Sequence, residues 1–126
     1  MNEKRENIVM SKSYAFALRI IKLYKYLIAE KKEFVLSKQL LRSGTAVGAL
    51  IKEAEHAQSK AHFISKMNIA LKEANETDYW LMLLKDSSYL DEKSFQSIYA
   101  DNSELIKLLV SIVKTSKNKL KSKNEK

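Results

Sequence analysis

The chain has no proline and only two glycines among its 126 residues, and this scarcity restricts the folds open to it. Tight turns between β-strands depend heavily on glycine and proline, so a turn-rich β architecture is disfavoured. Leucine, isoleucine, alanine, lysine, glutamate and serine are the most frequent residues. Most of these favour long helices, so the composition predicts an all-α protein.

Apolar residues recur every three or four positions along four segments, as they do on one face of an amphipathic helix. The third segment is the most regular, with a 3.5-residue period from Phe63 to Leu84 that is typical of bundle packing. Ser59 and Asp91 precede the third and fourth segments, and their side-chain oxygens can cap a helix N-terminus. The expected helices span approximately residues 13–31, 36–57, 60–87 and 92–115.

Short breaks join these segments, and helices with short connections pack as antiparallel neighbours. The prediction is one domain, an up-down-up-down antiparallel four-helix bundle over residues 13–115. Residues 1–12 are expected to form a flexible N-terminus and residues 116–126 a basic flexible tail.

The third segment also carries apolar residues outside its main stripe. A monomeric bundle would leave some of them exposed, and exposed apolar patches usually mark interfaces. The pattern therefore indicates a homo-oligomer. The residues concerned are Ile64, Ile69, Leu71, Trp80, Met82 and Leu83.

Gly44 and Gly48 lie four residues apart within the second expected helix. Glycine weakens a helix interior by roughly 1 kcal/mol relative to alanine, so two glycines on one face indicate close approach of another helix. That helix belongs either to the same bundle or to a neighbouring subunit.

Positive charge is concentrated at the C-terminal end. The formal net charge is +8, and residues 114–126 hold six lysines and one glutamate. Such a segment can bind phosphate backbones through counterion release, or it can simply be a solvated, solubilising end. The candidate nucleic-acid contacts are Lys114, Lys117, Lys119, Lys121 and Lys123, with Arg42, Lys52, Lys60 and Lys66 in the body of the domain.

Catalytic and metal-binding patterns are absent from the sequence. Glu53 and His56 have the i, i+3 spacing of di-iron bundle ligands, but His62 has no glutamate three residues before it to complete such a site. We therefore expect no enzymatic activity, cofactor or metal. The chain has no cysteine and no apolar run near the roughly 18 residues of a membrane span, so we expect a cytoplasmic protein.

Two long segments carry a family resemblance. The run from Leu41 to Ala54 contains Arg-Ser and Glu-Ala pairs, and the run from Ser59 to Leu81 contains Phe-Ile-x-Lys followed by Ala-Leu-Lys-Glu-Ala. In this order they resemble the four-helix bundle protein family encoded in intervening sequences of bacterial 23S ribosomal RNA genes. The resemblance covers roughly Tyr14 to Lys114.

The resemblance implies a homopentamer of four-helix bundles that forms a ring with a central channel. It also implies kinship with the accessory protein of diversity-generating retroelements, a basic pentameric barrel that binds nucleic acid and a reverse transcriptase. Two functions are compatible with these features. One is a non-enzymatic accessory protein that binds RNA or DNA, and the other is a structural or protein-interaction helical module with no nucleic-acid role.

Overall fold

The computed structural model describes residues 3–125 and shows an all-α chain of four helices, which confirms the predicted fold class. Residues 1, 2 and 126, which belong to the two predicted flexible termini, lie outside the described residues. The helices are α1 (Glu3–Ala29), α2 (Leu36–Ala54), α3 (Lys60–Asp86) and α4 (Glu92–Glu125).

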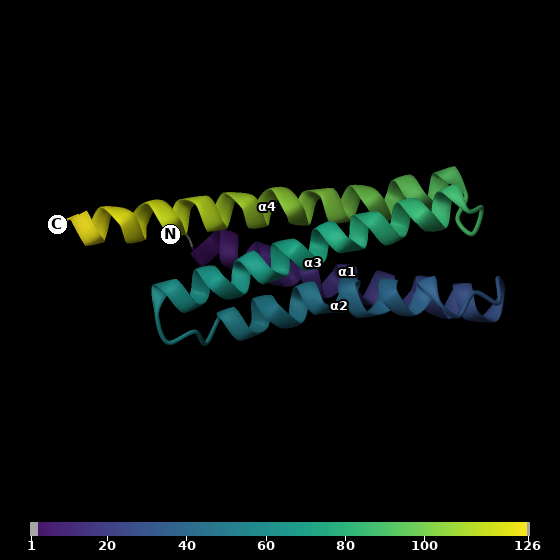
Figure 1. Ribbon diagram of the computed structural model, residues 1–126, viewed down its shortest axis with the longest axis horizontal. Helices are drawn as coiled ribbons and strands as arrows, with labels where there is room; N and C mark the ends of the chain where they lie inside the picture. The colour runs from purple at the N-terminus through teal and green to yellow at the C-terminus, as the bar shows by residue number, and fades with distance from the viewer. Residues whose placement is uncertain (1–2, 126) are drawn as a thin grey trace.

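The helices lie lengthwise against one another (Figure 1). The loops after α1 and after α3 lie at one end of the molecule, while the loop after α2 and both chain ends lie toward the other. Helix α2 packs against α1 and α3, and α3 also packs against α4, whereas α1 and α4 contact each other least. This last pair is therefore the loosest edge of the bundle.

The predicted apolar stripes supply the core. On α2, residues Leu40, Val47 and Ile51 are buried, as the 3–4 spacing requires. On α3 the stripe is buried from Met67 onward, although Phe63 at its start is half-buried and its neighbour Ile64 is buried instead. The largest fully buried side chains of the core include Phe16, Ile20, Leu27, Leu81, Leu84, Leu105, Leu109 and Ile112.

Both predicted N-caps are confirmed. Ser59 Oγ accepts a hydrogen bond of 3.0 Å from the His62 backbone N–H, and Asp91 Oδ1 accepts one of 2.7 Å from that of Ser94. Each satisfies a backbone donor that the first turn of a helix would leave free. The start of α2 differs from these two, because Val35, the residue before the helix, makes no side-chain capping hydrogen bond.

Glu33 organises the start of α2. Its carboxylate accepts hydrogen bonds from the backbone N–H groups of Val35, Leu36 and Ser37 at 3.1, 3.0 and 2.6 Å. Burial by itself raises the pKa of Glu33, but the backbone donors of Leu36, Ser37 and Val35 together outweigh it and lower the pKa below its ordinary value. An ionised Glu33 therefore holds the α1–α2 loop and the first turn of α2 together.

The helices extend further at both ends of the chain than the sequence analysis expects. Helix α1 begins at Glu3 rather than near Ser13, and Val9 is fully buried. Helix α4 continues to Glu125, so residues 116–125 are helical and do not form an irregular tail. The apolar spacing persists through buried Ser116 to Leu120, which packs on the core, and no proline or glycine interrupts it. Within residues 3–125, no helix is long and apolar enough to cross a membrane.

Candidate nucleic-acid interface

The C-terminal half of α4 collects lysines without neighbouring acids. Residues 105–124 hold six lysines and no aspartate or glutamate. All five predicted lysines, Lys114 to Lys123, are exposed and lie on this one segment. Figure 1 shows the end of α4 extending beyond the ends of the other three helices. We call residues 107–123 the lysine-rich end of α4.

Helical spacing arranges these lysines on more than one face. Lys107, Lys114, Lys117 and Lys121 are separated by seven, three and four residues, so they form one stripe. Lys107 is exposed and belongs to this stripe, although the sequence analysis does not include it. Its distance of seven residues from Lys114 is the signal that would have identified it.

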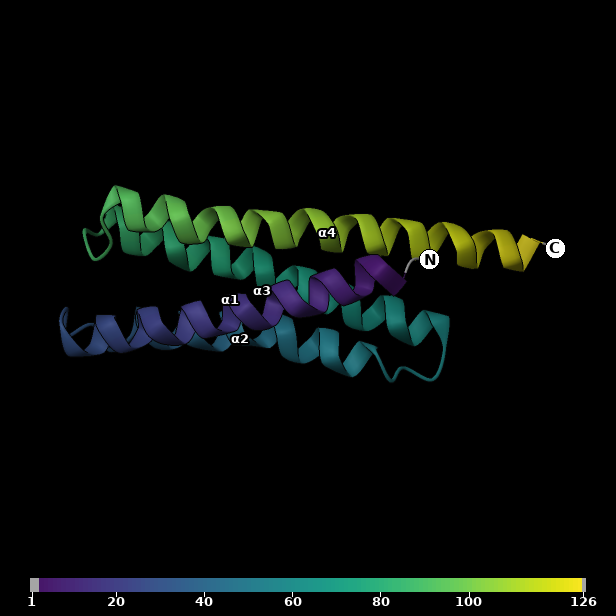
Figure 2. The ribbon, with the colours of Figure 1, turned by 180° about the vertical axis from the view of Figure 1, so that it is seen from behind.

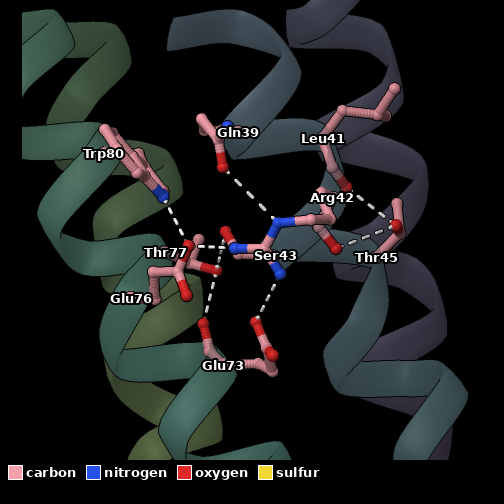
Figure 3. Close-up of polar contacts among 9 residues, drawn as sticks. All are labelled: Gln39, Leu41, Arg42, Ser43, Thr45, Glu73, Glu76, Thr77 and Trp80. Atoms are coloured by element: carbon pink, nitrogen blue, oxygen red, sulfur yellow. Dashed lines mark hydrogen bonds and ion pairs between the residues drawn. The ribbon is translucent and has the colours of Figure 1, made fainter.

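Arg42 is engaged by carboxylates of the neighbouring helix (Figure 3). Its Nη1 donates to Glu73 Oε1 at 3.1 Å, and its Nη2 donates to Glu76 Oε2. Trp80 Nε1 donates to the same Glu76 oxygen at 2.9 Å. The Trp80 N–H and the Arg42 guanidinium lower the pKa of Glu76 against the opposing effect of burial. The charge of Arg42 is therefore matched within the protein, which makes it a tie between α2 and α3.

The other three body candidates are not alike. Lys66 Nζ lies 2.8 Å from Glu53 Oε1, so this lysine is also paired. Lys60 is exposed, with its Nζ 6.0 Å from the centroid of the Phe63 ring, and Lys52 is exposed. The structure therefore pairs two of the four body candidates with acids, and it places all four on α2 and α3 rather than on α4.

Basic side chains of α1 tie it to α4 at intervals of seven residues. The pairs are Arg5 with Ser111 and Thr115 (3.1 Å to Thr115), Lys12 with Glu104 (3.2 Å), and Arg19 with Ser97 (3.0 Å) and Asp101 (2.6 Å). The residue number falls along α4 as it rises along α1, so these two helices run in opposite directions. The sequence analysis missed this ladder, although the heptad spacing of the three basic residues was visible.

The ladder ends where the two helices separate. Figure 2 shows α1 close to α4 near its N-terminal end and diverging from it toward its C-terminal end. A groove of about 960 Å³ opens beyond Arg19, lined by the C-terminal half of α1, the loop after it, the α3–α4 loop and the start of α4. We call this hollow the α1–α4 groove. Sequence reasoning did not find it, because its lining comes from segments far apart in the chain.

Gly44 and Gly48 both face α1. A Cβ added at Gly44 would lie 2.8 Å from Ile20 Cγ1 and 2.9 Å from Ile20 Cγ2, which is closer than real contacts allow. A Cβ added at Gly48 would lie 3.4 Å from the Ser13 carbonyl oxygen and from Ser13 Oγ. Gly44 therefore permits the closer approach, and its partner helix belongs to the same bundle.

Two buried polar contacts flank α3. Thr77 Oγ1 is hydrogen-bonded to Ser43 Oγ of α2 at 2.9 Å, and both residues are fully buried. On the other side, the buried Asn102 of α4 donates to Asp78 Oδ1 at 2.7 Å. Burial raises the pKa of Asp78, with hydrogen bonds from Asn102 and Tyr99 opposing it. These contacts fix the helix register, because each polar group needs its partner when it is removed from water.

The two histidines are exposed, as expected for residues near the α2–α3 loop. Among the described residues, no three histidine, aspartate or glutamate side chains come together in a way that could hold a metal ion.

The long helices, the apolar stripes and the charged surface define the class of protein as a small helical bundle with a basic exterior. The sequence pattern of the 23S rRNA-intervening sequence protein family matches residues 5–111. The chain belongs to this family.

One solved structure shows how closely the fold is shared. It is a protein with unknown function from the S23 ribosomal protein family of Bacteroides thetaiotaomicron, which is 58% identical to this chain with a TM-score of 0.87. The alignment covers 87% of this chain and 98% of that one. Among proteins with curated descriptions, none matches this chain.

Proposed function

We propose that this chain is a non-enzymatic accessory protein that binds the phosphate backbone of RNA or DNA in the cytoplasm. The observation that carries the proposal is the lysine-rich end of α4, whose lysines are exposed and have no acidic residue between them in the sequence. A rigid helix holds these charges at fixed spacing, and the segment extends beyond the rest of the bundle (Figure 1).

Backbone binding of this kind depends on salt in a predictable way. Each phosphate neutralised on a single strand changes the slope of log K against log salt by about −0.7. Such contacts carry little sequence information, because every nucleotide presents the same phosphate. We therefore expect strong salt dependence and weak sequence preference.

The test is a titration of fluorescently labelled single-stranded RNA at several salt concentrations. A variant with Lys117→Gln, Lys121→Gln and Lys123→Gln should bind at least tenfold more weakly, with a salt slope reduced by about 2. The matched control, Lys25→Gln, Lys38→Gln and Lys72→Gln, removes the same charge from exposed positions elsewhere, and it should change affinity less than threefold. No binding by the unmodified chain at low salt would refute the proposal, and equal losses in both variants would remove α4 as its basis.

The exposed apolar surface supports assembly. Tyr14 and Leu18 lie one turn apart on α1 and are 69% and 53% exposed, and Tyr79 and Met82 of α3 are 56% and 47% exposed. Water-exposed apolar side chains at i, i+4 and i, i+3 spacing form continuous patches. We accordingly propose that the chain is an up-down-up-down subunit of a homo-oligomeric ring, with five copies as the family resemblance implies.

The same patches favour a second candidate function, a protein-interaction module without a nucleic-acid role, whose partner would be a reverse transcriptase or another protein. Sedimentation velocity tests the assembly directly. The unmodified chain should sediment as an oligomer, and Leu18→Lys should shift it toward the monomer if α1 forms the interface. A monomer at micromolar concentration would contradict the ring.

A further inference from the structure

The α1–α4 groove carries a strong excess of positive charge. Its basic lining residues are Arg19, Lys22, Lys31, Lys85 and Lys93. Among the described residues that line it, one is acidic, Asp91. A second hollow of about 660 Å³, next to the α2–α3 loop, is lined by one lysine, Lys60, against two acids, Glu6 and Glu55. The α1–α4 groove therefore differs from this second hollow in its excess of positive charge.

Three of the basic side chains are unmatched. Among the described residues, Lys22, Lys31 and Lys93 have no carboxylate within ion-pair distance, and all three are exposed. The other two are already engaged. Arg19 is bound to Asp101, and Lys85 Nζ lies 4.6 Å from the centroid of the Phe95 ring.

The one acidic lining residue offsets only part of the charge of the five basic ones. The carboxylate of Asp91 is the N-cap of α4 and accepts the Ser94 backbone N–H at 2.7 Å. That hydrogen bond lowers the pKa of Asp91, and the charges of Lys93 and Lys31 lower it further. A ligand that enters the groove therefore meets lysines whose charge is available to an incoming anion.

An aromatic ring stands beside these charges. Tyr26 lies one helical turn after Lys22, lines the same groove and is 43% exposed. Tyr89, from the α3–α4 loop, is a second ring in the lining and is half-buried. Cations that track a backbone, combined with exposed rings on which bases stack, are the general elements of single-strand recognition.

We propose that the α1–α4 groove binds a segment of single-stranded nucleic acid, with phosphates on Lys22, Lys31 and Lys93 and an unpaired base stacked on Tyr26. This inference rests on the proposed function and deepens it, because it names a second site with a preference for strand type. The faces of paired bases are buried in a duplex, so a duplex cannot stack a base on Tyr26 and is not held in the groove beside the three lysines. The lysine-rich end of α4, which has charge without aromatic rings, contacts both kinds of strand.

The experiment compares labelled single-stranded and duplex oligonucleotides of one sequence. The groove variant carries Lys22→Gln, Lys31→Gln and Lys93→Gln, and the matched control is the variant with Lys117→Gln, Lys121→Gln and Lys123→Gln. The groove variant should lose at least tenfold in affinity for the single strand and less than threefold for the duplex. The control should weaken both alike. Thermal melts by circular dichroism verify that the variants fold.

A second pair of variants tests the ring. Tyr26→Phe keeps the aromatic face and should bind single strands as the unmodified chain does, while Tyr26→Leu should bind about tenfold more weakly. Unchanged binding by Tyr26→Leu would overturn the proposal, because the groove would then recognise charge alone, as an acidic peptide or polyphosphate could supply it.

The two proposals fail in different ways. If the groove variant binds single strands like the unmodified chain while the α4 variant loses affinity, the groove inference is overturned and the proposed function stands. If the unmodified chain binds neither strand type at low salt, the proposed function fails and the groove inference fails with it. Equal losses for both strand types in the groove variant would also overturn the inference, since net charge alone would account for them.

Discussion

The α2–α3 seam and the α1–α4 seam join neighbouring helices in opposite ways. At the α2–α3 seam, a buried hydrogen bond between Ser43 and Thr77 lies beside an arginine that grips two carboxylates. At the α1–α4 seam, polar ties occur once every seven residues, they are largely exposed, and they stop at Arg19. Beyond that point Lys22, Lys31 and Lys93 line the groove, and within residues 3–125 none of them forms an ion pair.

The difference shows that these charges do two kinds of work. Where each cation is paired with a carboxylate, the charges hold neighbouring helices together and are not available to a ligand. Where cations outnumber carboxylates, mutual repulsion opposes close approach and the charge remains available to a ligand. Mutations at the α2–α3 seam should therefore change the stability of the fold, and mutations in the α1–α4 groove should change ligand binding.

The largest expected effect on stability lies where α2 meets α1, at Gly44, the residue that follows Ser43 of the α2–α3 seam. Gly44→Ala places a methyl group against Ile20, whereas Gly48→Ala meets Ser13 at an ordinary contact distance. Both changes gain the same helix propensity, so overpacking alone separates them, by about 2 kcal/mol in the free energy of unfolding. Urea denaturation of the two variants measures this difference. Equal stabilities would show that Ile20 moves aside freely.

The buried pair at the α2–α3 seam comes next. Thr77→Val keeps the shape but leaves the Ser43 hydroxyl without its partner in the core, which should cost about 1.5 kcal/mol. Adding Ser43→Ala removes the unsatisfied group and should recover part of the loss. If Ser43→Ala lowered the free energy of unfolding as much in the Thr77→Val background as in the unmodified chain, the two residues would not be coupled.

The charged cluster at the same seam should give a pH-dependent effect of about 1 kcal/mol. The Trp80 N–H and Arg42 hold the pKa of Glu76 below its ordinary value of 4.5. The folded-state pKa is the lower one, so the contribution is present above about pH 4.5 and is lost as the pH falls through the folded-state pKa. Glu76→Gln should therefore destabilise at neutral pH and much less once the pH is below the folded-state pKa. A destabilisation that does not depend on pH would assign the effect to packing.

The smallest effect is expected at the α1–α4 seam. Glu104→Gln removes the partner of Lys12, and both side chains are about half exposed. An exposed single pair contributes little, so the free energy of unfolding should change by less than about 0.5 kcal/mol. A change as large as that of Glu76→Gln would erase the contrast between the two seams.

The fold could be predicted because its signals are local. The spacing of Leu40, Val47 and Ile51 places them on one helix face whatever the rest of the chain does, and the caps at Ser59 and Asp91 precede their helices directly. The residues at which helices begin and end were harder to predict from the sequence. Lysine favours helix, so a run of lysines after Thr115 is compatible with both a solvated tail and a continued helix.

The candidate site was harder to predict because it depends on pairing at a distance. Whether a cation is available depends on the acids that the fold brings to it. The sequence gives no sign that Arg42 is paired, because its partners Glu73 and Glu76 lie more than thirty residues later. Lys22, Lys31 and Lys93 belong to separate segments, and only the divergence of α1 from α4 makes them one group. The lysine-rich end could be identified because its members are neighbours in sequence.

The length of α4 sets the distance between the α1–α4 groove and the lysine-rich end. It runs without interruption for 34 residues, from the edge of the α1–α4 groove to the lysine-rich end. Lys93 and Lys121 are 28 positions apart, which is about 42 Å at the rise of an α-helix. A strand that touches both must cover that distance, or about 12 stacked nucleotides at 3.4 Å each. Affinity measured against oligonucleotide length should therefore rise in a step near this length, where one chain first holds the same strand at two places.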